Sequence, residues 1–330
     1  MKKLAMMLMV TMVLLVAACG NSANSNTAIE KNNAAKPNEF VLKYRVESQE
    51  APVVYYTKDV SAQGLMKVYR SLNQQIIGKT GIKVSFGSEN EQYLDPKLMT
   101  ELVKVTKGTF IDACGFTPPR GNAAGNYAVA ERHGFTAVAP VDIIDADGDI
   151  DMPVHGGYNL KYARTGSHFD DYDTLIAVHR FKAHNLPRYG GNLKNISLCL
   201  GSLSGKAIIH SGGTNEVSFE RKGDDITAQS FADAAKAAMD YKQGRWAFVN
   251  VLDAFEPADD CRDTKNLGDI GIIASIDPVA LDQAACDFVF GAAPDENTRN
   301  VWEATHSVNL LEYAEKIGVG KRSYQLISLD

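Results

Sequence analysis

The centre of the chain gathers side chains that bind anions or metal ions. Glycine-rich turns separate three histidines, two lysines and an asparagine: His179, Lys182, His184, Lys194, Asn195 and His210. Gly190 and Gly191 precede a predicted helix, whose first turn would offer free backbone N–H groups beside Lys194. The pattern therefore predicts an anion- or carboxylate-binding site made by Lys182, Lys194 and Asn195.

Four cysteines follow Cys19, and they fall into two pairs by context. Cys199 lies in the apolar run ISLCLG and Cys286 lies on a predicted helix, so we expect both in the core. Cys114 follows a strand end and Cys261 lies in the acidic loop EPADDCRD, and open α/β sheets place their chemistry in such loops. A Cys114–Cys261 disulfide is the alternative in an exported chain.

The chain has no CxxC pair and no ferredoxin-type cysteine run, so a metal site would be assembled from distant segments. The residues predicted to form it are Cys114, His184, His210, Cys261 and Asp277. Asp277 precedes Pro278 at the start of a predicted helix, where capping explains it without a ligand role. Thiolate, imidazole and carboxylate groups together suit a metal ion or an iron–sulfur cluster. The rival prediction is a binding protein that captures a small anionic solute without chemistry.

The N-terminus predicts an exported bacterial lipoprotein. Lys2 and Lys3 precede the apolar run from Leu4 to Ala18, which is short for a membrane span and ends in small residues. The quartet Val-Ala-Ala-Cys that ends at Cys19 resembles the bacterial lipobox, in which the cysteine sulfur receives diacylglycerol. We therefore expect a signal peptide over residues 1–18, lipidated Cys19, and a flexible tether over 19–45.

Composition limits the classes of partner. The formal net charge is −6, and it becomes −8 once Lys2 and Lys3 are removed with the signal peptide. An acidic chain without a basic cluster argues against nucleic-acid binding. The predicted partners are a membrane, reached through the lipid on the extracytoplasmic face of the cell membrane or the outer membrane, and a small molecule. Whether the protein is an enzyme stays open.

Alternating strand and helix patterns must position these residues. The predicted strands are 53–58, 82–86, 109–113, 135–144, 174–179, 247–252, 271–275 and 324–329. Two predicted helices begin after Ser61 and at Asp95-Pro96. The others span 123–133, 192–200, 230–241, 278–290, 296–305 and 310–317. Near-continuous apolar strands that alternate with helices predict an α/β fold over residues 46–330. We expect a mostly parallel central sheet covered by helices on both faces, with a division into two lobes as an option.

Several of these segments resemble the domain of unknown function 362 family. They are HRFKAHNLPRYGGNLKNIS, SGKAIIHSGG, DIGIIASIDPVALDQAACD and the C-terminal segment THSVNLLEYAEKIGVGKRSYQLISLD. The likeness runs from about Pro52 to Asp330. The resemblance implies a functional cysteine at Cys114, an acidic cysteine loop at Asp259–Cys261, and histidines at His184, His210 and His306. Many members of the family are iron–sulfur proteins with ferredoxin-type repeats, which this chain lacks. Asp259 also replaces one cysteine of the paired loop.

Overall fold

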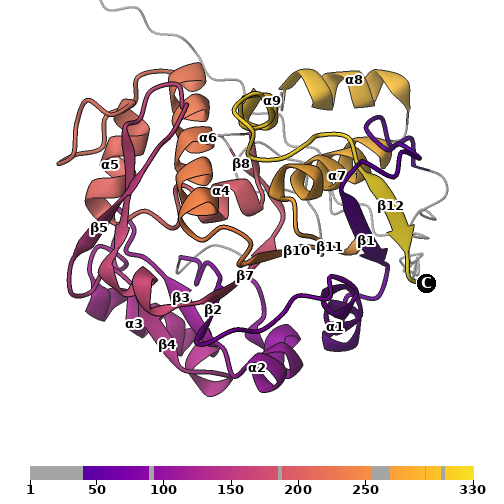
Figure 1. Ribbon diagram of the computed structural model, residues 1–330. Helices are drawn as coiled ribbons and strands as arrows, with labels where there is room; N and C mark the ends of the chain where they lie inside the picture. The colour runs from indigo at the N-terminus through magenta and orange to yellow at the C-terminus, as the bar shows by residue number, and fades with distance from the viewer. Residues whose placement is uncertain (1–39, 89–92, 185–187, 254–267, 294, 306–308) are drawn as a thin grey trace, which may run out of the picture. The chain divides into compact units, whose positions relative to one another are not determined.

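A mostly parallel sheet lies at the centre of the protein, for which we analysed a computed structural model. The structure describes residues 40–88, 93–184, 188–253, 268–293, 295–305 and 309–330. Described strands of the main sheet follow the order β12-β1-β11-β10-β7-β2-β3-β4 (Figure 1). Their bounds are β1 Val53–Thr57, β2 Thr80–Lys83, β3 Thr109–Asp112, β4 Val141–Ile143, β7 Thr174–Arg180, β10 Trp246–Leu252, β11 Gly271–Ser275 and β12 Gln325–Ser328.

Because β11 runs antiparallel to its neighbours, the residues that follow the strands lie at two opposite edges of the sheet. Strands β10, β7, β2, β3 and β4 pair in parallel, so their carboxyl ends meet at one edge. Strand β11 pairs antiparallel with both β10 and β1, with Ser275 opposite Phe248 and Gly271 opposite Leu252. The residues after β11 therefore emerge at the opposite edge.

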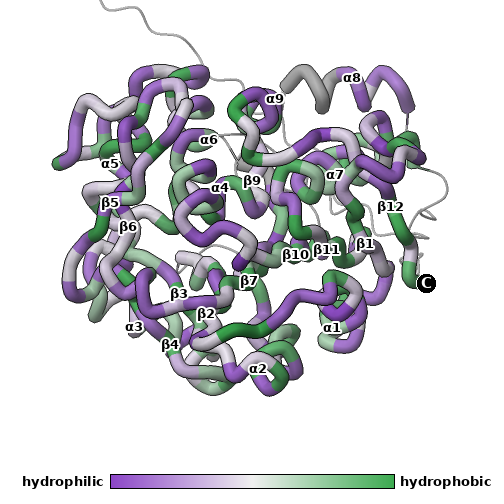
Figure 2. Tube along the Cα trace, viewed as in Figure 1, coloured by the Kyte–Doolittle hydropathy of each residue, from purple (hydrophilic) through white to green (hydrophobic). Residues whose placement is uncertain are grey.

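The central strands are apolar because both of their faces are covered. Strands β7, β10 and β11 show hydrophobic colours along most of their length (Figure 2), and every residue of β10 and β11 is buried. Along β7, Ile176 and Val178 pack into one core, while Leu175 and Ala177 pack into the other. This alternation is what a strand with two covered faces requires.

Helices cover both faces, which confirms the predicted fold class. One core is built on α1 (Ala62–Ser71), α2 (Thr100–Thr106) and α3 (Ala123–Arg132). The other is built on α4 (Asn192–Ile196), α5 (Leu203–Ser211), α6 (Asp224–Tyr241), α7 (Pro278–Gly291) and α9 (Asn309–Lys316), with α8 (Glu296–Thr305) against α7 (Figure 1). Single-turn helices η2 (Pro96–Met99), η3 (Phe135–Ala137) and η4 (Ser167–Asp171) complete the connections. The described residues form one unit rather than two lobes.

Some elements differ from the sequence prediction. The strand predicted over 135–144 is instead η3 followed by the short strand β4, because Gly134 takes a positive φ of 82° and a turn precedes Val141. Helix α4 ends at Ile196, four residues early, in a turn that contains Cys199. Helix α5 and the hairpins β5 (Asp149–Pro153) with β6 (Tyr162–Gly166) and β8 (Lys182–His184) with β9 (Arg188–Gly190) were not predicted.

The segment before β1 also corrects a predicted boundary. The Phe40 ring packs edge-on against Phe288 with centroids 5.5 Å apart, and Tyr44 N donates to the Asp287 carboxylate at 2.9 Å. Residues 40–45 therefore belong to the domain rather than to the tether expected over 19–45. The signal peptide and Cys19 lie outside the described residues. Among those described, no helix has the length and apolarity to cross a membrane.

Candidate functional site

Polar residues break the apolar pattern of four neighbouring strands near their carboxyl ends. They are Lys83 on β2, Asp112 on β3, His179 on β7 and Asn250 on β10, and each is at least 95% buried. His179 and Asn250 are directly paired across β7 and β10. Buried polar groups require partners, so this row defines where chemistry is concentrated in the sheet.

Asp112 is the centre of a buried ion cluster that holds the strand ends together. Its carboxylate accepts from Lys83 Nζ at 3.1 Å, Arg120 Nη2 at 2.7 Å, and the backbone N–H groups of Phe86 and Ala113. Burial acts to raise the pKa of Asp112, but the charges of Lys83 and Arg120 outweigh it and hold that pKa below its usual value. Asp112 is therefore a charged structural hub rather than a free ligand.

Helix α4 is fixed over the strand ends by side-chain amides. Asn195 Oδ1 accepts from Lys83 Nζ at 2.8 Å, and Asn192 Nδ2 donates to Asn250 Oδ1 at 2.9 Å. On the other side of α4, Asp282 of α7 accepts from Asn250 Nδ2 at 2.7 Å. We call Lys83, Asn192, Asn195, Asn250 and Asp282 the polar layer, because they join α4 and α7 to the sheet.

The predicted anion site at the start of α4 is taken by the protein's own carboxylate. Backbone N–H groups of Asn192 and Leu193 donate to the two oxygens of Asp282, each at 2.8 Å. A Cβ on Gly191 would lie 2.3 Å from Asp282 Oδ1, so glycine is needed for this approach. These two N–H groups are not free, contrary to expectation, and Asp282 is buried rather than facing solvent. Burial raises its pKa to about 6, against the opposing effect of its donors.

Of the three residues predicted to bind an anion, Lys194 is the best placed. Asn195 is used within the polar layer, and Lys182 lies on β8 beside a cavity of about 20 Å³ that His179 also lines. Lys194 is half-buried on α4, and its ammonium group makes no hydrogen bond or ion pair with any residue that the structure describes. A cation in this position is available to an external anion.

Two buried histidines with an unused ring nitrogen lie near Lys194. His179 Nε2 has no hydrogen-bond partner among the described residues, and it lies 3.7 Å from the position of a Cβ on Gly190, as does Lys194 Cδ. His210 Nδ1 likewise has no partner there. Burial, followed by the charge of Lys194, lowers the pKa of His179 well below its usual value and that of His210 to about 4. Both imidazoles are therefore neutral at pH 7.

Aromatic rings surround His210 where it faces out of α5. Phe219 lies edge-on to the imidazole at 4.6 Å between centroids, Phe116 lies at 6.2 Å, and Phe231 lies at 5.9 Å from inside the core. Phe116 and Phe219 are 38% and 55% exposed and also contact each other. The imidazole thus lies beneath a partly exposed apolar rim.

Cys199, in the turn after α4, and Lys206, on α5, complete the set of residues that we describe around Lys194 and the two histidines. Lys206 of α5 is buried and donates from Nζ to the Gly201 carbonyl. Burial lowers the pKa of Lys206 to about 8, and Cys199 and Asp145 oppose that shift. We name His179, Lys194, Cys199, Lys206 and His210 the basic site.

Cys114 follows β3 and is held against Asp145. Its backbone N–H donates to both oxygens of Asp145, at 3.0 and 3.2 Å. Burial and then the Asp145 charge raise the pKa of the Cys114 thiol to about 12. Without a bound metal ion, Cys114 is therefore a protonated thiol at neutral pH, and the ligand role predicted for it stays a prediction.

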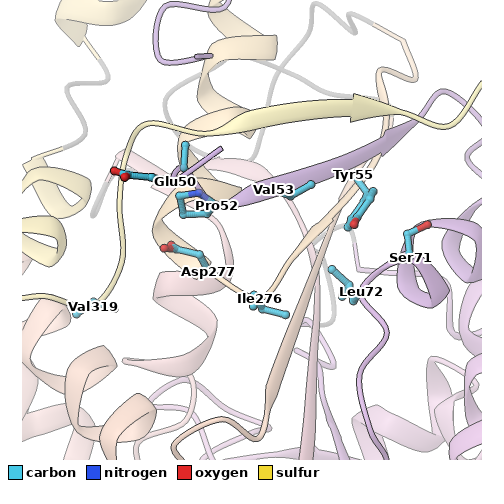
Figure 3. A pocket seen from close by; sticks show the side chains of 10 residues that line it. Glu50, Pro52, Val53, Tyr55, Ser71, Leu72, Ile276, Asp277 and Val319 are labelled. Atoms are coloured by element: carbon cyan, nitrogen blue, oxygen red, sulfur yellow. The ribbon is translucent and has the colours of Figure 1, made fainter. Parts of the chain in front are cut away.

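Asp277 lies at the opposite edge of the sheet and does not join the predicted metal site. It follows β11 and caps α7, accepting from Val279 N and Ala280 N at 2.9 Å and from Lys321 N at 3.0 Å. A cavity of about 470 Å³ lies beside it, between β1, the end of α1 and Ile276 (Figure 3). The capping explanation for Asp277 is confirmed. Its predicted role as a ligand shared with Cys114 is corrected, because Cys114 follows β3 and that strand ends at the other edge of the sheet.

The described members of the predicted metal set do not fit one shared ion. Among the residues that the structure describes, no group of three or more His, Cys, Asp or Glu side chains could hold a metal. Cys261 and the loop residue Asp259 lie outside those residues, as do His306 and the side chain of His184 on β8. A metal or iron–sulfur cofactor therefore stays a prediction, whereas the alternative Cys114–Cys261 disulfide is not formed, because Cys114 is a free thiol. Cys114, Cys199 and Cys286 are free thiols.

Sequence reasoning missed most of the residues that build the site, although a signal was present. Lys83, Asp112 and Asn250 are single polar residues in the apolar strands TGIK, TFID and WAFVNVL. A polar residue inside such a strand has to find a buried partner, so it marks a site or a structural cluster. Lys206 and Arg120 gave no comparable signal, because a lysine or an arginine in a helix or a loop is usually exposed.

Fold and site together define an α/β protein with a basic site at the carboxyl edge of a mostly parallel sheet. Residues 80–287 match the family described as Domain of unknown function (DUF362), and the chain belongs to that family. A comparison with curated proteins gives no match.

Solved structures resemble the chain at low identity. The lactate racemase apoprotein from Thermoanaerobacterium thermosaccharolyticum is 14% identical over 78% of this chain, and a protein from Thermotoga maritima is 10% identical over 75%, each with a TM-score of 0.44. The chain spans about 60% of the length of each. These similarities say nothing about activity.

Proposed function

We propose that the domain binds a small anion, such as a carboxylate or a phosphate, at the basic site. The observation that carries the proposal is Lys194, a half-buried residue whose ammonium has no described partner. Its Cδ and the unused ring nitrogen of His179 each lie 3.7 Å from the position of a Cβ on Gly190. Burying an unpaired charge and an unpaired polar atom together is costly. An anion that accepts from Lys194 would satisfy the charge, and the imidazole would supply a neutral hydrogen-bonding group.

The balance of charge around the site favours an anion over a cation. The Asp112 carboxylate is already shared by Lys83 and Arg120, and Asp145 is bonded to the Cys114 backbone. Lys206 adds a further buried amine. The acidic groups near Lys194 thus already have partners, Asp282 included, whereas the Lys194 ammonium has none among the described residues.

Isothermal titration with malonate and with inorganic phosphate tests the proposal. We expect Lys194→Gln to weaken binding about 10- to 100-fold, because a charge-assisted hydrogen bond contributes roughly 1.5–3 kcal/mol. Lys67→Gln, which removes the same charge from an exposed position on α1, is the matched control. Equal loss in both variants, or no saturable binding to the wild type, would mean that the basic site does not bind small anions.

We propose further that the domain is held on the outer side of a membrane by lipid on Cys19. The proposal is supported by the Lys2-Lys3 n-region, the short apolar run after it and the small residues before Cys19. Cys19→Ala should leave the precursor unlipidated and unprocessed at that site, so its mobility should change and the membrane-bound fraction should fall. Cys199→Ala is the control and should fractionate as the wild type does. A Cys19→Ala protein of unchanged mobility that stays with salt-washed membranes would overturn the anchor.

A further inference from the structure

The cavity of about 470 Å³ beside Asp277 is separate from the basic site. It lies at the opposite edge of the sheet, between β1, the end of α1 and the residue that follows β11 (Figure 3). Small-molecule sites in proteins usually measure roughly 300–1,000 Å³, so the space is large enough for a compact organic ligand. The two ends of the cavity differ in chemistry, and this difference indicates which class of ligand it fits.

One end of the cavity is mostly apolar. Leu72, at the end of α1, and Ile276, after β11, lie toward this end together with Tyr55 of β1 (Figure 3). Ile276 is 59% exposed, whereas Leu72 and Tyr55 are half-buried. A single exposed apolar side chain is ordinary, but here side chains from three separate elements line one space. An apolar group bound there would remove their surface from water, which favours binding.

Two carboxylates mark the other end of the cavity. Glu50 precedes β1 and Asp277 caps α7, and Figure 3 shows both on the side away from Leu72. The Glu50 carboxylate makes no hydrogen bond or ion pair with any residue that the structure describes. Burial raises the pKa of Asp277 although three backbone N–H groups oppose that shift, so a nearby positive charge would stabilise its ionised form.

No positive charge balances these carboxylates within the described lining of the cavity. The described lining residues include Glu50 and Asp277 but no lysine, arginine or histidine. Lys321 donates to Asp277 from its backbone N–H at 3.0 Å, yet it is not a lining residue. An anion would therefore be repelled, whereas a cation would meet complementary charge. A molecule with an ammonium group on an apolar body matches both ends.

We propose that this cavity binds a small organic cation, namely a primary amine with an apolar or aromatic body. The ammonium group, which has three N–H donors, donates to the Glu50 and Asp277 carboxylates. The apolar body contacts Leu72 and Ile276. This site does not depend on the proposed anion binding, because it lies at the other edge of the sheet and prefers the opposite charge.

Three ligands of similar shape test the proposal on the full-length protein. Benzylamine is a cation at pH 7, benzyl alcohol is neutral and phenylacetate is an anion, and all three carry the same ring. Backbone amide shifts in two-dimensional NMR spectra would give both the affinity and the place of binding. We expect saturable shifts at Val53, Leu72 and Ile276. Benzylamine should bind about tenfold more tightly than benzyl alcohol, and phenylacetate should bind more weakly than both.

Two variants test the two ends of the cavity separately. Glu50→Gln should reduce the preference for benzylamine over benzyl alcohol roughly threefold, because water screens an exposed ion pair. Glu131→Gln, at an exposed position on α3, is its control and should leave the preference unchanged. Ile276→Ser should weaken both ligands by roughly fivefold, because it removes apolar contact. Ile226→Ser, at a partly exposed position on α6, is the control for that variant.

Several outcomes would overturn the proposal. Wild-type protein might show no saturable binding, shifts confined to other residues, or equal affinity for benzylamine and benzyl alcohol. An unchanged preference in folded Glu50→Gln protein would remove the carboxylate from the site. Displacement of benzylamine by malonate would show that the two ligands share one site, which contradicts the separation of the cavity from the basic site.

Discussion

The two edges of the sheet place their polar groups in opposite ways. At the carboxyl edge of β7 and β2, the Nε2 atom of His179 and the ammonium group of Lys194 have no partner among the described residues. At the other edge, Asp277 accepts from three backbone N–H groups beside a cavity of about 470 Å³. A cavity of this size therefore lies where the neighbouring carboxylate is already satisfied, so its volume alone does not locate the candidate site.

The difference has an energetic reason. A buried polar atom without a partner costs about 1–3 kcal/mol, so a fold retains one only where something offsets that cost. A bound anion that pairs with Lys194 would do so at the basic site. Nothing comparable is needed beside Asp277, where most of the residues that line the cavity are apolar, among them Val53, Leu72 and Ile276 (Figure 3).

The largest effect should come from breaking the ion cluster that supports the basic site. Lys83→Met removes the Nζ partner of Asp112, Asn195 and the Val84 carbonyl at once. Removing one partner of a buried ion pair costs roughly 3–5 kcal/mol, because the other charge stays buried. We expect the free energy of unfolding, measured in urea, to fall by about that amount.

Lys67→Met is the matched control for this variant, since Lys67 is exposed on α1. It should change the free energy of unfolding by less than about 0.5 kcal/mol. A Lys83→Met protein as stable as the control would show that the Asp112 cluster does not stabilise the carboxyl edge. The contrast between the two edges would then rest on the unpartnered groups only.

The strands and helices of this fold were largely readable from the sequence, because local patterns determine them. Strand β11 and helix α7 have the predicted starting residues, since an apolar run and an Asp-Pro cap are local signals. The contacts that build the site are not local. Lys83 and Asn195 are 112 residues apart, and Asn192 and Asp282 are 90 apart. No spacing rule connects such pairs.

The cysteines show the limit of reading a site from local context. Cys199 lies in an apolar run, which predicts a core residue, yet α4 ends early and leaves it half-buried among lysines. Cys114 follows a strand end, which predicts function, yet Asp145 and burial keep its thiol protonated. Cys286 is buried as predicted. In each case the charge supplied by distant segments decides the chemistry.

The smallest effect should come from the opposite edge. Asp277→Ala removes the cap of α7 and the acceptor of Lys321 N, and loss of a helix cap costs about 0.5–2 kcal/mol. We expect the free energy of unfolding to fall by about 1 kcal/mol, while malonate binding, measured by titration well below the melting temperature, stays unchanged. Malonate sits beside Lys194 in our proposal, and that residue approaches the sheet at the other end of β7 and β10. The Lys67→Gln control should bind malonate with unchanged affinity. If folded Asp277→Ala protein bound malonate more weakly while this control did not, the two edges of the sheet would be coupled. Our description of them as independent would then be wrong.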